Sequence, residues 1–96
     1  MNLNSILTIL KENKNTFKEY GVIKIGVFGS YVRNEQKTNS DIDILVQFDK
    51  EKKNYKNFLK TSQLAEKLFD TKVDLVTTES LSPYIGPYIK KEVIYA

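Results

Sequence analysis

The chain has 96 residues, of which 41% are apolar and 28% charged, and this length and composition predict a single globular domain covering residues 1–96. It contains no cysteine and no histidine, which excludes disulfides, thiolate nucleophiles and cysteine-based zinc sites, and leaves carboxylates, hydroxyls, lysine and one arginine for any chemistry. The net charge of +3 comes with scattered lysines, which predicts a weak attraction for phosphates and no dedicated nucleic-acid surface.

Targeting signals are not evident in the sequence. No apolar run is long enough to cross a bilayer. Residues 1–11 carry neither an early positive cluster nor a small-residue cleavage site. We therefore expect no membrane span, no signal peptide and a cytoplasmic location.

The first half of the chain is predicted to form a helix followed by a strand. Residues 3–19 place apolar side chains at helical spacing, with Asn2 as a plausible cap and Gly21 positioned to end the helix. Residues 22–28 are rich in β-branched side chains and are predicted to form a buried strand that runs directly into Gly29-Ser30. A short helix or turn is expected to follow over residues 31–37.

The second half is predicted to contain two more strands and two more helices. The alternation in 41–48 and the apolar run in 72–77 indicate strands, and 55–69 carries an apolar helical stripe. Ser82-Pro83 is typical of a helix start, and Gly86-Pro87 should keep that helix short or bent; residues 92–95 are left open. Strands alternating with helices predict an α/β or α+β fold with one central sheet. Tyr84 and Tyr88, one helical turn apart, are interpreted as packing or interface residues.

Two aspartates in the second predicted strand are the first candidate for chemistry. Asp41 and Asp43 should point to one side of the strand, with Ile42 and Ile44 on the other. Two carboxylates at this spacing repel, and a divalent cation such as Mg²⁺ removes the repulsion and takes oxygen ligands. The alternative is a polar strand edge whose two aspartates are simply solvated.

A third carboxylate, Asp74, lies in the next predicted strand between Val73 and Leu75. If this strand lies beside the second one, Asp74 can join the same metal site. Otherwise it is an acidic residue on an exposed strand face. The order of the strands, which decides between these alternatives, is not fixed by the sequence.

The end of the first predicted strand is a candidate phosphate site. Gly29 allows a phosphate to approach the backbone closely, and Ser30 adds a hydroxyl donor. Arg33, the only arginine, follows at once, and a guanidinium group recognises phosphate oxygens in a bidentate manner. A plain strand-to-helix turn beside a surface cation is the alternative interpretation.

The combined pattern is Gly29-Ser30, ten residues, then Asp41-Ile42-Asp43, with the run continuing as Ile44-Leu45-Val46. It resembles the minimal nucleotidyltransferase family of the DNA polymerase beta-type superfamily, over nearly the whole chain. The resemblance implies a nucleotidyltransferase fold with a small mixed sheet flanked by helices. It also implies that Asp41, Asp43 and Asp74 bind two Mg²⁺ ions and act in catalysis, and that Gly29, Ser30 and Arg33 bind the nucleotide.

The same resemblance implies a function. Stand-alone domains of this kind commonly act as antitoxins, pairing with HEPN-type toxins and attaching AMP from ATP to a tyrosine, as in a type VII toxin–antitoxin system. Two alternatives stay open at this stage. One is an antitoxin that neutralises its partner by occlusion with inert carboxylates, and the other is a transferase acting on a small molecule or an RNA end.

Overall fold

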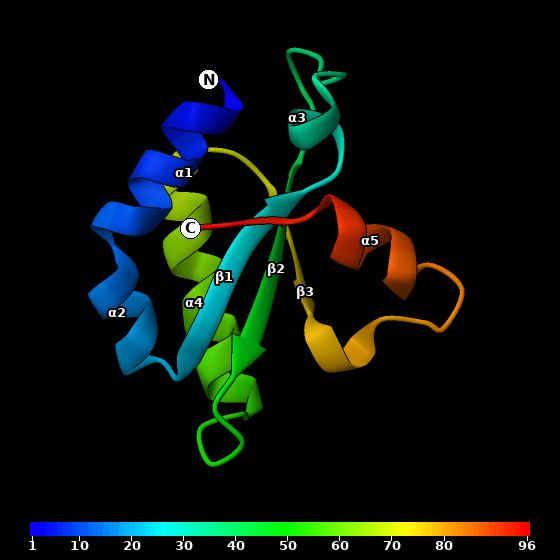
Figure 1. Ribbon diagram of the computed structural model, residues 1–96. Coiled ribbons are helices and arrows are strands. Elements are labelled where there is room, and N and C mark those ends of the chain that lie inside the picture. Colours follow the sequence, from blue (N-terminus) through cyan, green and yellow to red (C-terminus); the bar gives the residue numbers. More distant parts are fainter.

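The computed structural model describes residues 1–96 and contains one four-stranded sheet with helices on both of its sides (Figure 1). The strand order is β3-β2-β1-β4; β1 is antiparallel to both β2 and β4, and β2 is parallel to β3. The predicted class, an α/β fold with a small mixed sheet, is confirmed. The elements in chain order are α1 (Leu3–Glu12), α2 (Lys14–Glu19), β1 (Val22–Phe28), α3 (Ser30–Arg33), β2 (Ile42–Phe48), α4 (Tyr55–Phe69), β3 (Val73–Thr77), the 3₁₀ turn η1 (Thr78–Ser80), α5 (Gly86–Glu92) and β4 (Ile94–Tyr95).

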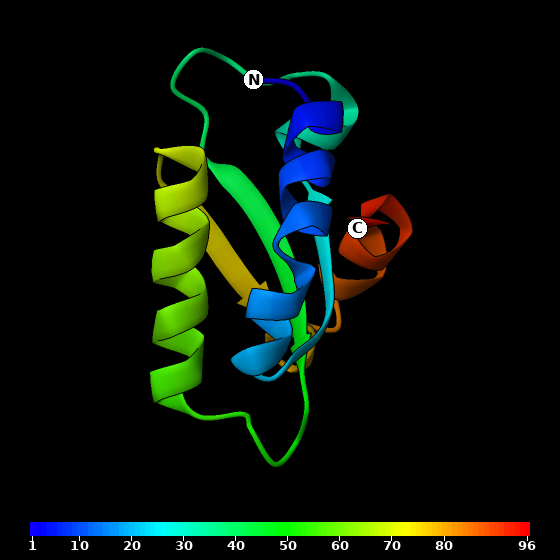
Figure 2. The ribbon, with the colours of Figure 1, turned by 90° about the vertical axis from the view of Figure 1, so that its left-hand side faces the viewer.

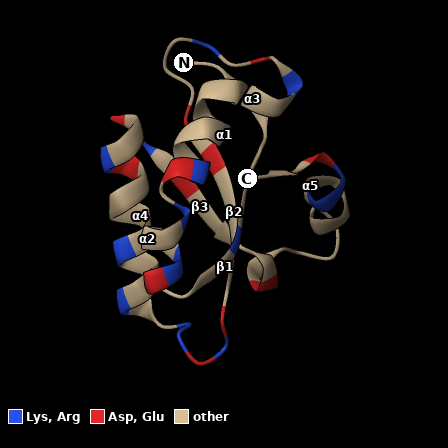
Figure 3. Ribbon diagram, turned by 60° about the vertical axis from the view of Figure 1, so that its left-hand side comes forward, with Lys and Arg blue, Asp and Glu red and all other residues tan.

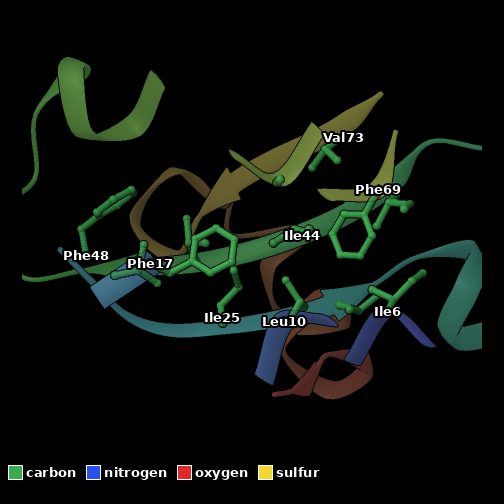
Figure 4. Close-up of a cluster of buried hydrophobic side chains, with 13 residues drawn as sticks. Ile6, Leu10, Phe17, Ile25, Ile44, Phe48, Phe69 and Val73 are labelled. Carbon is green, nitrogen blue, oxygen red and sulfur yellow. The ribbon is translucent and has the colours of Figure 1, made fainter. Parts of the chain in front are cut away.

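Helices α1, α2 and α4 cover one face of the sheet, and α5 lies on the other side (Figure 2). The main core lies under the three helices and contains 13 buried residues (Figure 4). Each large apolar side chain that is buried there contributes on the order of 1.5–3 kcal/mol. The labelled members of this core are Ile6, Leu10, Phe17, Ile25, Ile44, Phe48, Phe69 and Val73.

The N-terminal helical region differs from the prediction because it is broken in two. The Asn2 cap is confirmed, since its side chain accepts the amide of Ser5 at 2.9 Å. At Asn13 the backbone leaves the helical region (φ −109°, ψ 13°), and the side-chain amide of Asn13 donates to the carbonyl of Ile9 at 2.8 Å. A side chain that bonds to the backbone in this way competes with continuation of the helix. Gly21, with φ 91°, follows the end of α2 as expected.

The C-terminal helix begins later than predicted. Ser82 does not start α5; its carbonyl accepts the Gly86 amide at 2.8 Å and its hydroxyl accepts the Ile85 amide at 3.0 Å, which forms a turn ahead of the helix. The helix begins at Gly86, with a proline in its first turn. Pro87 has the fixed φ that suits a helix start and has no amide hydrogen to leave unpaired. The helix is short, at seven residues, as expected, but Gly86-Pro87 begins it and does not interrupt it.

The end of the chain forms the short strand β4, which pairs with β1 through Gly26 and Val27. Gly26 is required there, because a Cβ at this position would collide with the carbonyl of Ile94. Tyr84 and Tyr88 have exposed fractions of 83% and 76%, so they do not pack in the core. Their interpretation as interface residues stays a prediction.

The charged residues are spread over the helices, strands and loops of the ribbon (Figure 3). Lysines are distributed along α2, α4, α5 and the loop at 49–54, and the arginine ends α3. None of the helices combines the length and the apolar character that a membrane span requires.

Candidate active site

Two of the three predicted aspartates are direct neighbours in the sheet. Asp43 on β2 pairs with Asp74 on β3 in the parallel ladder, so both side chains lie on the same face. Asp43 also pairs with Phe28, the last residue of β1, which places it beside the corner formed by Gly29. The strand order that the sequence left open therefore brings Asp43 and Asp74 together at one end of the sheet.

Asp41 lies just before β2 and is more exposed. Its carboxylate is 3.9 Å from the Nζ of Lys72, whose side chain is also largely exposed, so this ion pair contributes little to stability. Asp41 nevertheless lies near enough to Asp43 to act on it electrostatically. It is thus a peripheral member of the acidic group, which otherwise centres on Asp43 and Asp74.

The charge of Asp43 is destabilised by its surroundings. Partial burial, with added repulsion from Asp74 and Asp41, raises the pKa of Asp43 to about 6 from an ordinary value of 3.8. Arg33 acts in the opposite direction, but its effect is smaller than that of these three causes. A nearby cation would stabilise the charged form of Asp43, because it offsets both the cost of burial and the repulsion from the other carboxylates.

Gly29 is required by its conformation and by its neighbour. Its φ of 80° and ψ of −150° lie in a region that residues with side chains rarely adopt. A Cβ built on Gly29 would also collide with the carboxylate of Asp43. The glycine therefore lets β1 end in direct contact with the central aspartate.

Ser30 and Arg33 follow on the four-residue helix α3. Ser30 is half-buried, and its hydroxyl has no hydrogen-bond partner within the protein. The Arg33 guanidinium bonds through Nε to Glu35 at 2.7 Å and through Nη1 to Glu92 at 2.6 Å. Hydrogen bonds to Glu35 and Glu92 raise the pKa of Arg33 further, so it stays a cation at every working pH.

Glu92 is a residue of this region that the sequence did not predict. It ends α5, and its carboxylate also accepts the Gly29 amide at 2.7 Å. A separation of 63 residues hides this contact from any local pattern. The one available signal was the strand at residues 92–95, which was left open; only its pairing with β1 brings Glu92 to the corner.

Comparison with known proteins identifies the family of this chain. The family model for the nucleotidyltransferase domain matches residues 3–96. The chain belongs to the nucleotidyltransferase domain family. It is 42% identical to protein adenylyltransferase MntA of Thermococcus cleftensis over 96 residues, which is 99% of this chain and 96% of that protein. A relative from Methanocaldococcus jannaschii is 42% identical over 98 residues, covering 97% of this chain and 96% of that protein.

Two solved structures share the fold of this chain. A structure of the minimal nucleotidyltransferase type superposes with a TM-score of 0.84 at 26% identity, covering 98% of this chain and 95% of that one. A toxin–antitoxin structure with AMP-PNP superposes with a TM-score of 0.68 at 27% identity, covering 99% and 72%. The family and the enzyme class predicted from the sequence are both confirmed.

The donor set of this nucleotidyltransferase suits a hard cation. Carboxylate oxygens are the ligands that Mg²⁺ prefers, and the raised pKa of Asp43 is what an uncompensated acidic site produces. No three acidic side chains lie close enough together to form a ready-made metal cluster. Mg²⁺ commonly keeps waters and takes phosphate oxygens beside one or two carboxylates, so Asp43 and Asp74 fit it in that mode.

The largest cavity of the nucleotidyltransferase lies away from these carboxylates. It measures about 430 Å³ and is lined by Phe48, Phe58, Leu75 and Thr77 among others. Phe48 and Thr77 end β2 and β3, whereas Asp43 and Asp74 lie near the beginnings of those strands. We place the candidate site at the carboxylates, because they meet the Gly29 corner there.

Proposed function

We propose that this nucleotidyltransferase transfers AMP from ATP to a hydroxyl group in the presence of Mg²⁺, and that the acceptor is a tyrosine of a HEPN-type toxin. The observation that carries the proposal is the pairing of Asp43 with Asp74 directly beside the Gly29 corner. Support for adenylyl transfer and for the toxin comes from the relative named protein adenylyltransferase MntA and from the toxin–antitoxin structure with AMP-PNP.

The residues are assigned as follows. Asp41 and Asp43 would hold magnesium beside the triphosphate, with Asp74 completing the metal site, and Asp74 would accept the proton of the acceptor hydroxyl. The backbone at Gly29, the free hydroxyl of Ser30 and the permanent charge of Arg33 receive the β- and γ-phosphates. Magnesium, when bound, supplies positive charge at the phosphates that the carboxylates cannot supply themselves.

The chemistry is a single in-line displacement. The acceptor oxygen attacks the α-phosphorus, a new oxygen–phosphorus bond forms, and the bond to the β-phosphate breaks to release pyrophosphate. The proton of the acceptor hydroxyl passes to Asp74 and then to solvent. The acidic pair thus contributes by position and charge, and no covalent enzyme intermediate is required.

A labelling experiment tests the proposal. The protein is incubated with magnesium, ATP labelled at the α-phosphate and the product of the neighbouring gene. We expect label on that partner, and its loss in Asp41→Asn or Asp43→Asn. Asp49→Asn is the matched control, because Asp49 follows the opposite end of β2 and its side chain bonds only to the local Glu51 amide.

The outcomes separate the alternatives. Neutralisation of the toxin that persists in both Asp→Asn variants, without label, would indicate occlusion in place of catalysis. Label that appears only on a small molecule or on an RNA end would move the acceptor to that class. Replacement of the toxin tyrosines by phenylalanine then tests the acceptor itself.

A further inference from the structure

A single carboxylate joins the C-terminal helix to the Gly29 corner. The Oε2 of Glu92 accepts the Gly29 amide at 2.7 Å, and its Oε1 accepts the Nη1 of Arg33 at 2.6 Å. The Glu92 side chain is only 19% exposed, against 52% for Arg33, so the pair is partly shielded from water. Charge-assisted bonds of this length and burial are stronger than ordinary surface ion pairs.

These bonds hold Arg33 without using all of its donors. A guanidinium group has five N–H donors in a rigid plane. Glu35 takes the Nε donor and Glu92 takes one from Nη1, which leaves three N–H groups. The two carboxylates therefore fix the plane of Arg33 from two sides, and the remaining donors stay available for phosphate oxygens.

The position of Glu92 at the end of α5 shows which side of the corner it occupies. Glu92 comes two residues before β4, and β4 lies on the opposite side of β1 from β2 and β3. Its bond to the Gly29 amide therefore continues the β1–β4 edge. Ser30, the next residue along the chain from Gly29, keeps a hydroxyl with no partner within the protein.

We propose that Glu92 is a positioning residue of the nucleotidyl-transfer site, and that its carboxylate holds Arg33 and the Gly29 corner in the orientation that receives the triphosphate. The proposal rests on the proposed function in assigning Arg33 to the phosphates. Gly86 is the only buried residue of α5. The hydrogen bonds of Glu92 and the pairing of β4 with β1 are therefore the main contacts that connect residues 86–95 to the Gly29 corner.

The opposite role is a competitor, in which Glu92 occupies donors that the phosphates need. The two roles predict opposite signs. Removing a competitor would tighten nucleotide binding, because a negative charge leaves the site. Removing a positioning residue weakens binding, because Arg33 loses its fixed orientation and must be ordered by the nucleotide itself.

The test measures magnesium-dependent binding of AMP-PNP by calorimetry and AMP transfer kinetics in Glu92→Gln. Glutamine keeps the shape and can still accept the Gly29 amide, but it loses the charge-assisted bond to Arg33. We expect nucleotide binding and kcat/KM to fall by about tenfold or more, which is the usual effect of losing a bond between charged groups. The Glu79→Gln control removes an ion pair with Lys53 whose carboxylate is more exposed and which lies away from the corner, and it should change neither.

A double-mutant cycle shows whether Glu92 acts through Arg33. In an Arg33→Met background the Glu92→Gln change should have less than about a third of its effect in the wild type, because the cation that Glu92 contacts is already lost. The Gly29 amide resonance should also shift in Glu92→Gln, and the melting temperature shows that the variants are folded. Tighter AMP-PNP binding in Glu92→Gln, or an equal loss in both backgrounds, would overturn the assignment.

The experiment also separates this inference from the proposed function. A wild-type protein that binds AMP-PNP but transfers no AMP contradicts the transfer reaction, and the binding cycle then decides on Glu92 alone. A wild-type protein that does not bind AMP-PNP with magnesium contradicts both.

Discussion

The two faces of the sheet are built by different rules, although they share the same strands. On the face under α1, α2 and α4, the side chains of β2 are Ile42, Ile44, Val46 and Phe48, and all four are buried. On the other face, β2 presents Asp43, the buried Leu45 and the half-buried Gln47. Helix α5 lies on this side, and Gly86 is its only buried residue. One face is closed by packing, and the other keeps carboxylates beside a partly open corner. Stability is thus concentrated on the first face, and the chemistry that we propose belongs to the second.

The largest expected effect is on chemistry. Asp43→Asn should lower AMP transfer by about 1000-fold, because it removes the central ligand charge from the second face. The same change should leave the metal-free protein as stable as the wild type or more so, since it removes a carboxylate whose charge is disfavoured by burial. Transfer assays and urea unfolding in EDTA measure the two effects. A strongly destabilised Asp43→Asn would show that this face also supports the fold.

The neighbouring residue should give the reverse result. Ile44→Ala removes a side chain with no exposed surface from the main core and should cost about 2–5 kcal/mol of unfolding free energy. Transfer per folded molecule should stay close to that of the wild type. Urea unfolding and an assay corrected for the folded fraction check this. Loss of activity in fully folded Ile44→Ala would break the separation of the two faces.

Gly29→Ala is expected to lower both the stability and the AMP-transfer activity, because Gly29 ends β1 in direct contact with Asp43. The positive φ and the collision with Asp43 should cost about 1–3 kcal/mol and displace the carboxylate. Gly86→Ala is the milder comparison, since its φ is ordinary and its Cβ would press only on the Cβ of Leu81, at 3.2 Å. Thermal melts and transfer assays of both variants test this. Equal stabilities would mean that the corner can relax around a side chain.

The smallest effect concerns pH. The folded pKa of Asp43, about 6, lies above the ordinary value of 3.8, so the folded protein binds more protons than the unfolded chain between these values. The stability of the metal-free protein should therefore fall as the pH rises from about 4 to about 6, relative to Asp43→Asn. Urea unfolding of both proteins at several pH values measures the difference. Parallel stability curves would show that Asp43 titrates normally.

The first face was predictable from the sequence, and the second only in part. Alternation in 41–48 and helical spacing in 55–69 follow directly from apolar periodicity, and the structure confirms both elements. Asp43 could be placed beside Gly29 because local spacing relates them. The partnership of Asp43 with Asp74 needed the strand order, which depends on long-range pairing.

The differences between the predicted and the observed structure arise from individual hydrogen bonds, which apolar periodicity does not reveal. The break at Asn13 arises from a side-chain bond to the backbone, which competes with the helix although the apolar spacing continues. The late start of α5 arises from a turn closed by Ser82, which has the same sequence signature as a helix cap. Glu92 was missed because a contact across 63 residues leaves no trace in local periodicity.

The parallel pairing of β2 with β3 has a consequence for how the chain can change in length. The ladder itself, from Ile42–Val73 to Val46–Thr77, sets the distance between the two central aspartates. Residues 50–53, between Asp49 and the Asn54 cap of α4, can therefore gain or lose residues at a small entropic cost without moving Asp74 relative to Asp43. A one-residue slip within the ladder would instead turn Asp74 toward α4 and separate the pair. Length variation in this family is therefore expected to be tolerated in that loop and excluded from the first residues of β3.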